Sequence, residues 1–187
     1  MTDWRRYQEL LLKDSEPLVR ALFAENKKRR DVIAAIGYVF EFGRGHLCFD
    51  ICANTVRNAK KSVADYLAKY PDESPEDFRW NSGDYDYPGA VQDRFGGWSD
   101  TWSDELVKLD RLAEGKKHSK RVRDRIADIC CNVLAALASR GVFGDCSVID
   151  FNVAALLDRV ELVKKRDARI RDLIRSNDKR KPKGAPG

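Results

Sequence analysis

The stretch VIAAIGYVFEFGRGHLCFDICAN, residues 32–54, decides the fold because it reads as two β-strands joined by a short turn. β-Branched and aromatic residues fill both halves, and Gly43-Arg44-Gly45 interrupts them. Two such runs around a short glycine-containing segment are typical of a β-hairpin. Alternate side chains of a strand point to opposite faces. One face of the second strand is therefore expected to carry His46, Cys48, Asp50, Cys52 and Asn54.

Helices are predicted before and after the hairpin in the sequence. Apolar residues recur at helical spacing over residues 3–26, where Pro17 predicts a kink or a restart because proline lacks an amide donor. Thr55 is placed to cap a helix over residues 56–69. Further helices are expected over residues 103–114, with Ser103 as cap, 119–139, which ends before Gly141, and 153–175.

The order of these elements predicts an α+β fold, with a small antiparallel sheet built on the hairpin and packed against several helices. Residues 1–175 are expected to form a single α+β domain, and residues 176–187 a flexible basic tail. For CSVIDFNV, residues 146–153, a third short strand and a β-turn into the last helix both remain open.

Composition places the chain among globular intracellular proteins. It has 187 residues, of which 43% are hydrophobic and 35% charged, enough to bury a sizeable core. A secretory signal and a membrane-spanning run are both missing from the sequence pattern, so we expect a cytoplasmic location and no membrane partner. The five cysteines lack a disulfide or zinc-finger spacing, which favours reduced, mostly buried thiols.

Charge is segregated along the chain. Residues 70–105 contain ten Asp and Glu against Arg79 and Arg94, a net charge of −8. The acids alternate with large rings, which are favoured as interface anchors, and surrounding carboxylates would steer a cationic partner toward them. The partner-binding residues expected here are Trp80, Asp84, Tyr85, Asp86, Tyr87, Trp98 and Trp102.

The rings of this acidic, aromatic loop have an alternative role in the core. For each of the three tryptophans, Trp80, Trp98 and Trp102, the more common expectation is that the ring packs beneath the loop against the edge of the core. The carboxylates would then form a solvent-exposed rim. Tyr85 and Tyr87, which are flanked by Gly83, Asp84 and Asp86, are the rings we expect to be exposed.

The carboxyl-terminal end has the opposite charge. Residues 164–187 contain ten Lys and Arg against three acids. Such a cluster gains affinity for phosphate by releasing counterions, so a nucleic-acid-associated protein is the alternative function. Because no nucleic-acid-binding motif accompanies the charge, only weak nucleic-acid binding is expected.

Catalytic signatures are missing, so the sequence favours binding over catalysis. No Walker loop, nucleotide-binding glycine fingerprint, nucleophile elbow or metalloprotease helix occurs. His46, Cys48 and Asp50 could offer metal ligands from one strand face, but a closed zinc site needs further ligands that the sequence does not supply. We therefore expect no cofactor, no metal and no catalytic residues.

Two local stretches carry a family resemblance: ICANT at residues 51–55 and WNSGDYDYPG at residues 80–89. With the order helix, hairpin, helix and tryptophan-containing segment, the chain resembles a bacterial family of uncharacterised small α+β domains. That family includes candidate immunity proteins that occur beside secreted polymorphic toxins. The resemblance implies a non-catalytic, intracellular binder that neutralises a cognate protein. The acidic, aromatic loop suits a cationic toxin as that partner. The oligomeric state stays open.

Overall fold

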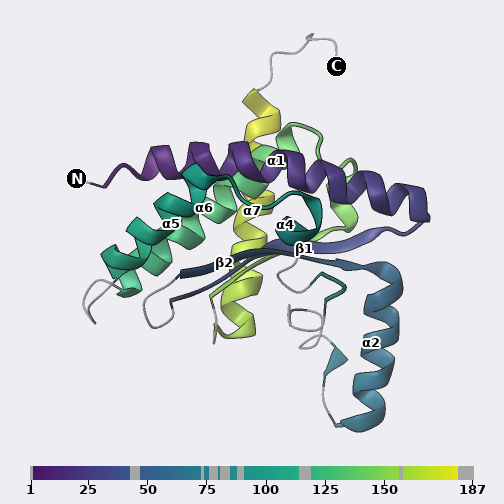
Figure 1. Ribbon diagram of the computed structural model, residues 1–187. Coiled ribbons are helices and arrows are strands. Elements are labelled where there is room, and N and C mark those ends of the chain that lie inside the picture. Colours follow the sequence, from purple (N-terminus) through teal and green to yellow (C-terminus); the bar gives the residue numbers. More distant parts are fainter. Residues whose placement is uncertain are drawn as a thin grey trace.

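The computed structural model describes residues 2–42, 47–72, 74–75, 80, 85–87, 91–113, 119–155 and 158–180. Within these ranges the elements are α1 (Trp4–Arg29), β1 (Ile33–Phe42), β2 (Leu47–Thr55), α2 (Val56–Lys69), α4 (Val91–Phe95), α5 (Asp100–Ala113), α6 (Ser119–Ser139), the 3₁₀ turn η2 (Cys146–Val148), β3 (Asp150–Ala155) and α7 (Val160–Arg180). In Figure 1, α1, α5 and α6 lie on one side of the sheet, and α2 extends from the other side. The predicted α+β class is confirmed.

The predicted hairpin forms the centre of the fold. β1 and β2 pair antiparallel, with Tyr38 opposite Ile51 and Phe40 opposite Phe49. Residues 43–46, which include the predicted turn and His46, lie outside the described residues. The hairpin forms because alternating large apolar residues give each strand one face that must be buried.

The third strand makes the sheet mixed, so the expectation of an antiparallel sheet is wrong for this strand. β3 lies parallel to β1, with Ile36 opposite Phe151, and the strand order is β2-β1-β3. A parallel partner needs a long crossover connection, which the helices between β2 and β3 supply. The open choice at residues 146–153 is resolved as a 3₁₀ turn followed by a strand.

One face of the sheet builds the main core with α1, α5 and α6. Tyr38, Phe40 and Phe49 form a ring cluster there, and Trp102 from α5 meets Phe49 edge-on with 5.5 Å between ring centroids. Tyr38 donates a hydrogen bond from its hydroxyl to Ser15 Oγ at 2.7 Å, which satisfies two polar groups inside this core.

Local sequence signals fixed some helix boundaries and missed others. α2 and α6 match their predicted ranges, and Thr55 Oγ1 accepts a hydrogen bond from Asn58 N as the expected cap. α1 continues through Pro17 as one helix. α5 begins three residues before Ser103, because Ser99 Oγ accepts a hydrogen bond from Trp102 N and takes the capping role.

The last helix begins and ends later than predicted. Residues 153–155 belong to β3, so α7 begins only at Val160. It continues to Arg180, and residues 176–180 are therefore helical where a flexible tail was expected. Residues 181–187 lie outside the described part of the chain. None of the described helices is long and apolar enough to cross a membrane.

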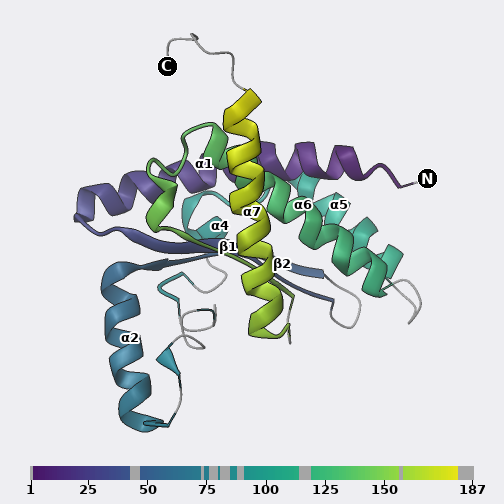
Figure 2. The same cartoon turned by 180° about the vertical axis from the view of Figure 1, so that it is seen from behind.

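Side chains of α7 cover the outer edge of β3. Figure 2 shows α7 passing from the helix-covered side of the sheet to its other side. Arg166 Nη1 donates to Val153 O at 2.7 Å, Phe151 N donates to Asp167 Oδ1 at 2.9 Å, and Arg171 Nη2 donates to Ile149 O at 2.8 Å. An edge strand with unpaired amides and carbonyls invites pairing with another chain, and these contacts remove that opportunity.

Candidate binding surfaces

The aromatic residues proposed as interface anchors lie largely inside the protein. Tyr85 and Tyr87 are each 5% exposed and Trp102 is 1% exposed. The prediction that Tyr85 and Tyr87 are exposed is therefore wrong. Trp80 and Trp98 are half-buried, so the core-closing alternative describes the tryptophans better.

Two residues of the same segment cover the outer edge of β2. Tyr87 exchanges backbone hydrogen bonds with Ala53, at 3.0 and 3.1 Å. Trp98 donates its indole N–H to Phe49 O at 3.0 Å. These contacts hold Tyr87 and Trp98 against the sheet. They satisfy backbone N–H and C=O groups at the edge of β2 that would otherwise need water or another chain as a partner.

Tyr85 instead covers the second face of the sheet. Its side chain packs with Ala35 and Cys52. Its hydroxyl accepts a hydrogen bond at 2.9 Å from Nδ2 of Asn152, a fully buried β3 residue that also donates to Trp80 O at 3.0 Å. A buried amide needs such partners, so Tyr85 is held by both packing and hydrogen bonding.

The acidic residues of the loop have different environments. Asp84 lies outside the described residues. Asp86 is exposed and accepts a hydrogen bond from the Thr55 hydroxyl. Glu105 is buried between Arg6 at 3.0 Å and Lys108 at 2.9 Å, and these cations hold the pKa of its carboxyl below the usual value, with the Lys108 hydrogen bond as the largest cause. Part of the predicted negative charge is therefore neutralised.

A separate group of carboxylates lies near the exposed Cys48 and the outer edge of β2. We define the acidic face as Glu41, Asp50, Asp93 and Asp110. Glu41 stands opposite Cys48 in the hairpin register. Gln92 on α4 donates a hydrogen bond to Asp50, which brings the neighbouring Asp93 close to β2. Among the described residues, none of the four carboxylates forms an ion pair with Lys or Arg.

Sequence reasoning missed most of this acidic face. Glu41, Asp50 and Asp110 lie outside the acidic segment, residues 70–105, in which we looked for a cluster, and only Asp93 lies inside it. The hairpin pattern could have identified Glu41, because antiparallel pairing places it across from the strand that carries Cys48 and Asp50. Nothing local to α5 indicates that Asp110 approaches the hairpin.

The negative charges near Cys48 affect the pKa of its thiol. Partial burial raises the pKa of its thiol first, and the charges of Asp50, Glu41 and Asp110 raise it further. Cys52 is buried, and burial raises the pKa of its thiol to about 12. Cys130 and Cys131 are buried as well. The polar strand face therefore presents one accessible thiol in a negative environment, and Cys52 is part of the core.

We expect iodoacetamide at pH 8 to modify Cys48 alone in a Cys146→Ser variant, more slowly than it modifies free cysteine. A raised pKa leaves less thiolate at a given pH, and the thiolate is the reactive form. Glu41→Gln removes one carboxylate and is expected to increase the rate. Mass spectrometry of tryptic peptides measures it.

The matched control is Glu9→Gln, which removes an exposed carboxylate from α1. It should leave the rate unchanged. Equal rates for Glu41→Gln and the parent protein would show that Glu41 does not act on the thiol.

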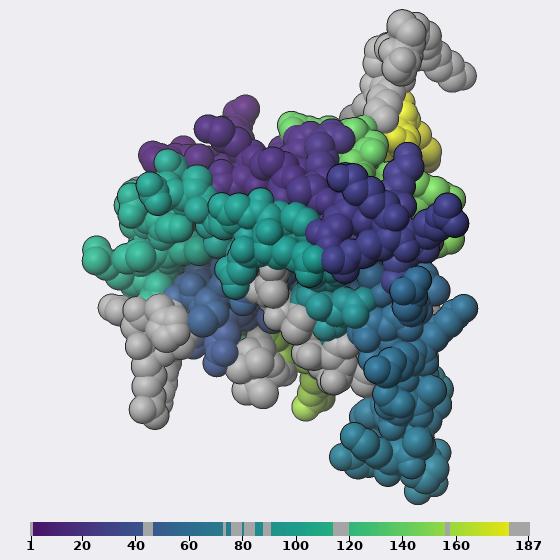
Figure 3. All heavy atoms as spheres, turned by 45° about the vertical axis from the view of Figure 1, so that its right-hand side comes forward, coloured from purple at the N-terminus to yellow at the C-terminus, as the bar shows by residue number. Residues whose placement is uncertain are grey.

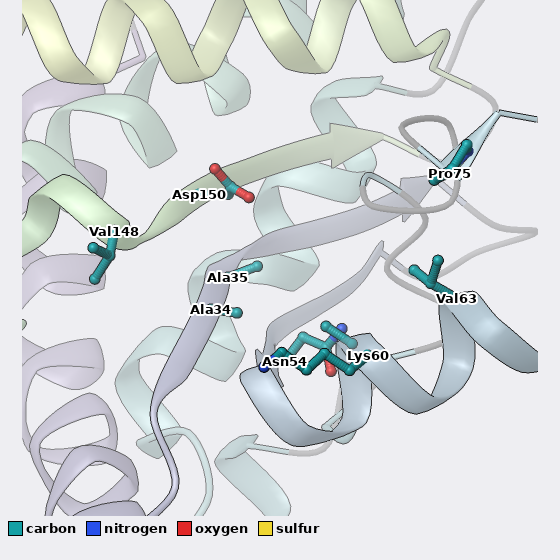
Figure 4. Close-up of a pocket in the computed structure, with 9 residues that line it drawn as sticks. Ala34, Ala35, Asn54, Lys60, Val63, Pro75, Val148 and Asp150 are labelled. Atoms are coloured by element: carbon teal, nitrogen blue, oxygen red, sulfur yellow. The ribbon is translucent and has the colours of Figure 1, made fainter.

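A mostly apolar pocket of about 620 Å³ lies between the second face of the sheet and α2. Figure 4 shows its lining: Ala34 and Ala35 from β1, Asn54 from β2, Lys60 and Val63 from α2, and Pro75, Val148 and Asp150. Asp150 is buried and stands 3.6 Å from Arg171. The described lining residues offer apolar contact and a few polar groups, the usual composition of a small-ligand pocket.

Comparison with known proteins gives a family without an assigned activity. The family model described as "Domain of unknown function (DUF4303)" matches residues 38–166. This range runs from the middle of β1 into the first half of α7 and includes every residue of the acidic face. No curated protein and no solved structure matches the chain.

Proposed function

The chain belongs to the DUF4303 family, whose function is unknown, and we propose that it is a non-catalytic protein-binding domain whose acidic face binds a basic surface of a protein partner. An immunity-type role, the neutralisation of a cationic toxin, is the form of this function that we propose. The observation that carries the proposal is the gathering of Glu41, Asp50 and Asp93 near the buried Asp110, all without paired cations among the described residues.

The acidic face replaces the aromatic loop in this proposal. Buried rings cannot serve as anchors for a partner, so Tyr85, Tyr87 and Trp102 are assigned to stability. The exposed carboxylates of Asp93, Asp100 and Asp104 extend the negative charge along α4 and α5. Electrostatic complementarity of this kind accelerates encounter and selects the partner.

The test is co-expression of the tagged protein with the product of each adjacent gene, followed by purification of any complex. We expect Glu41→Lys combined with Asp93→Lys to weaken that complex by about tenfold or more, since each reversal replaces an attraction by a repulsion. Isothermal titration calorimetry at several salt concentrations measures the affinity. The parent affinity should fall as salt rises.

The control pair is Glu9→Lys combined with Asp65→Lys. It makes the same change in net charge at exposed positions on α1 and α2. A complex that tolerates the first pair as well as the control pair does not form through the acidic face.

Nucleic-acid binding through the basic carboxyl-terminal segment stays a prediction. Several arginines of this segment form ion pairs within the protein: Arg166 with Asp158, Arg169 with Asp128 and Arg171 with Asp167. These guanidiniums have carboxylate partners already, so fewer positive charges remain for phosphate than the sequence count suggests.

A further inference from the structure

A polar hollow of about 360 Å³ lies where the end of α1, the start of α2 and α4 meet. These three segments lie next to one another on the face that Figure 3 shows. Four cationic side chains from three helices line the hollow: Arg29, Arg57, Lys61 and Arg94. The fold therefore gathers positive charge around this hollow.

Two of these cations share one carboxylate. Glu25 on α1 accepts hydrogen bonds from Arg94, and Arg29 pairs with the same carboxylate. Arg94 also stands over the ring of Tyr87, with 5.6 Å from Cζ to the ring centroid. The shared carboxylate and the ring fix the guanidinium of Arg94, while one negative charge serves two positive ones.

The other two cations are less compensated. Arg57 is 3.7 Å from Asp31, a long separation for an ion pair, and its side chain is 75% exposed. Lys61 forms no ion pair with any of the described residues. The second carboxylate of the lining, Asp86, is engaged by the Thr55 hydroxyl. With Glu25 included, four positive charges face three negative ones.

We infer that this hollow binds a small phosphate monoester that also carries hydroxyl groups, such as a sugar phosphate. Guanidinium groups present planar, forked N–H donors that match phosphate oxygens, and the ammonium of Lys61 adds a mobile point charge. Asp31 and Asp86 are acceptors in the same lining, which suits ligand hydroxyls as donors. The volume is that of a small-ligand site.

This arrangement differs from an ordinary set of surface ion pairs. Surface pairs neutralise one another along a helix, as Arg5 and Glu9 do. Here the cations come from three helices and surround a common space, so the positive charge is concentrated where a ligand can enter.

The experiment is calorimetric titration of the full-length protein with ribose 5-phosphate, inorganic phosphate and ribose at constant ionic strength. Ribose 5-phosphate should bind most tightly, inorganic phosphate more weakly, and ribose without saturation. Arg57→Gln combined with Lys61→Gln should weaken ribose 5-phosphate binding by about tenfold or more, because each change removes a charge-assisted hydrogen bond to the phosphate. Both side chains are exposed on α2, so their replacement should leave the unfolding temperature unchanged.

The control is Lys13→Gln combined with Lys69→Gln, which removes the same charge from exposed positions on α1 and α2. It should retain the parent affinity. Three results would overturn the inference: no saturable binding of either phosphate compound, equal affinities for ribose 5-phosphate and inorganic phosphate, or equal losses in the two double variants.

Discussion

Gly37→Ala is expected to lower the free energy of unfolding by about 3 kcal/mol or more, because overpacking against backbone cannot be relieved by rotating a side chain. A Cβ atom at position 37 would lie 1.5 Å from the backbone oxygen of Asn152 on β3. Either β1 and β3 must separate or the variant must lose the parallel pairing. Urea denaturation followed by circular dichroism measures the loss.

The comparison variant is Ala34→Gly on the same strand. It adds a glycine instead of removing one and should cost roughly 1 kcal/mol, the usual penalty for glycine within a regular element. A Gly37→Ala protein as stable as the parent would contradict the register in which Gly37 lies opposite Asn152.

Arg166→Met should destabilise the protein by about 3–5 kcal/mol, because it removes one partner of a buried ion pair and leaves the other charge without compensation. The side chains of Arg166 and Asp158 are 9% and 5% exposed, and their N–O separation is 2.6 Å. The same guanidinium donates to Val153 O, so an edge carbonyl of β3 also loses its partner. Thermal and urea unfolding measure the effect.

Two further variants separate burial from charge. Arg175→Met breaks the exposed pair with Asp172, where both side chains are at least 70% exposed, and should cost no more than about 1 kcal/mol. Arg166→Met combined with Asp158→Asn removes the uncompensated charge and should recover part of the loss. If Arg166→Met and Arg175→Met cost the same, the buried pair does not hold the edge of β3.

These two predictions concern one structural problem, a sheet of three strands with two outer edges. β2 is covered by Tyr87, Gln92 and Trp98. β3 is covered by side chains of α7. In larger sheets, further strands pair with the backbone groups at a strand edge, and here loops and helices cover those edges instead. Residues that the sequence suggested for partner binding, such as Tyr87 and Trp98, are therefore used inside the protein.

The candidate site was therefore predictable only in part. Negative charge and large rings in residues 70–105 were correctly recognised, but the inference that they form one outward surface failed at Tyr85 and Tyr87. Sequence alone could not reveal that Tyr85 packs on the second face of the sheet. Its ring contacts Ala35 on β1 and Cys52 on β2, and these residues come together only once the strands have paired in register. The acidic face likewise combines β1, β2, α4 and α5.

The sequence by itself determined the elements that depend on near neighbours. The hairpin follows from alternation and central glycines, α2 from its periodicity and the Thr55 cap, and α6 from its apolar stripe and the left-handed Gly141 that follows it. Tertiary structure decided the parallel place of β3, the burial of Tyr85 and Tyr87, and the gathering of like charges on two separate surfaces. Periodicity and capping act within a few residues, whereas these features depend on contacts between segments tens of residues apart, whose energies no local pattern records.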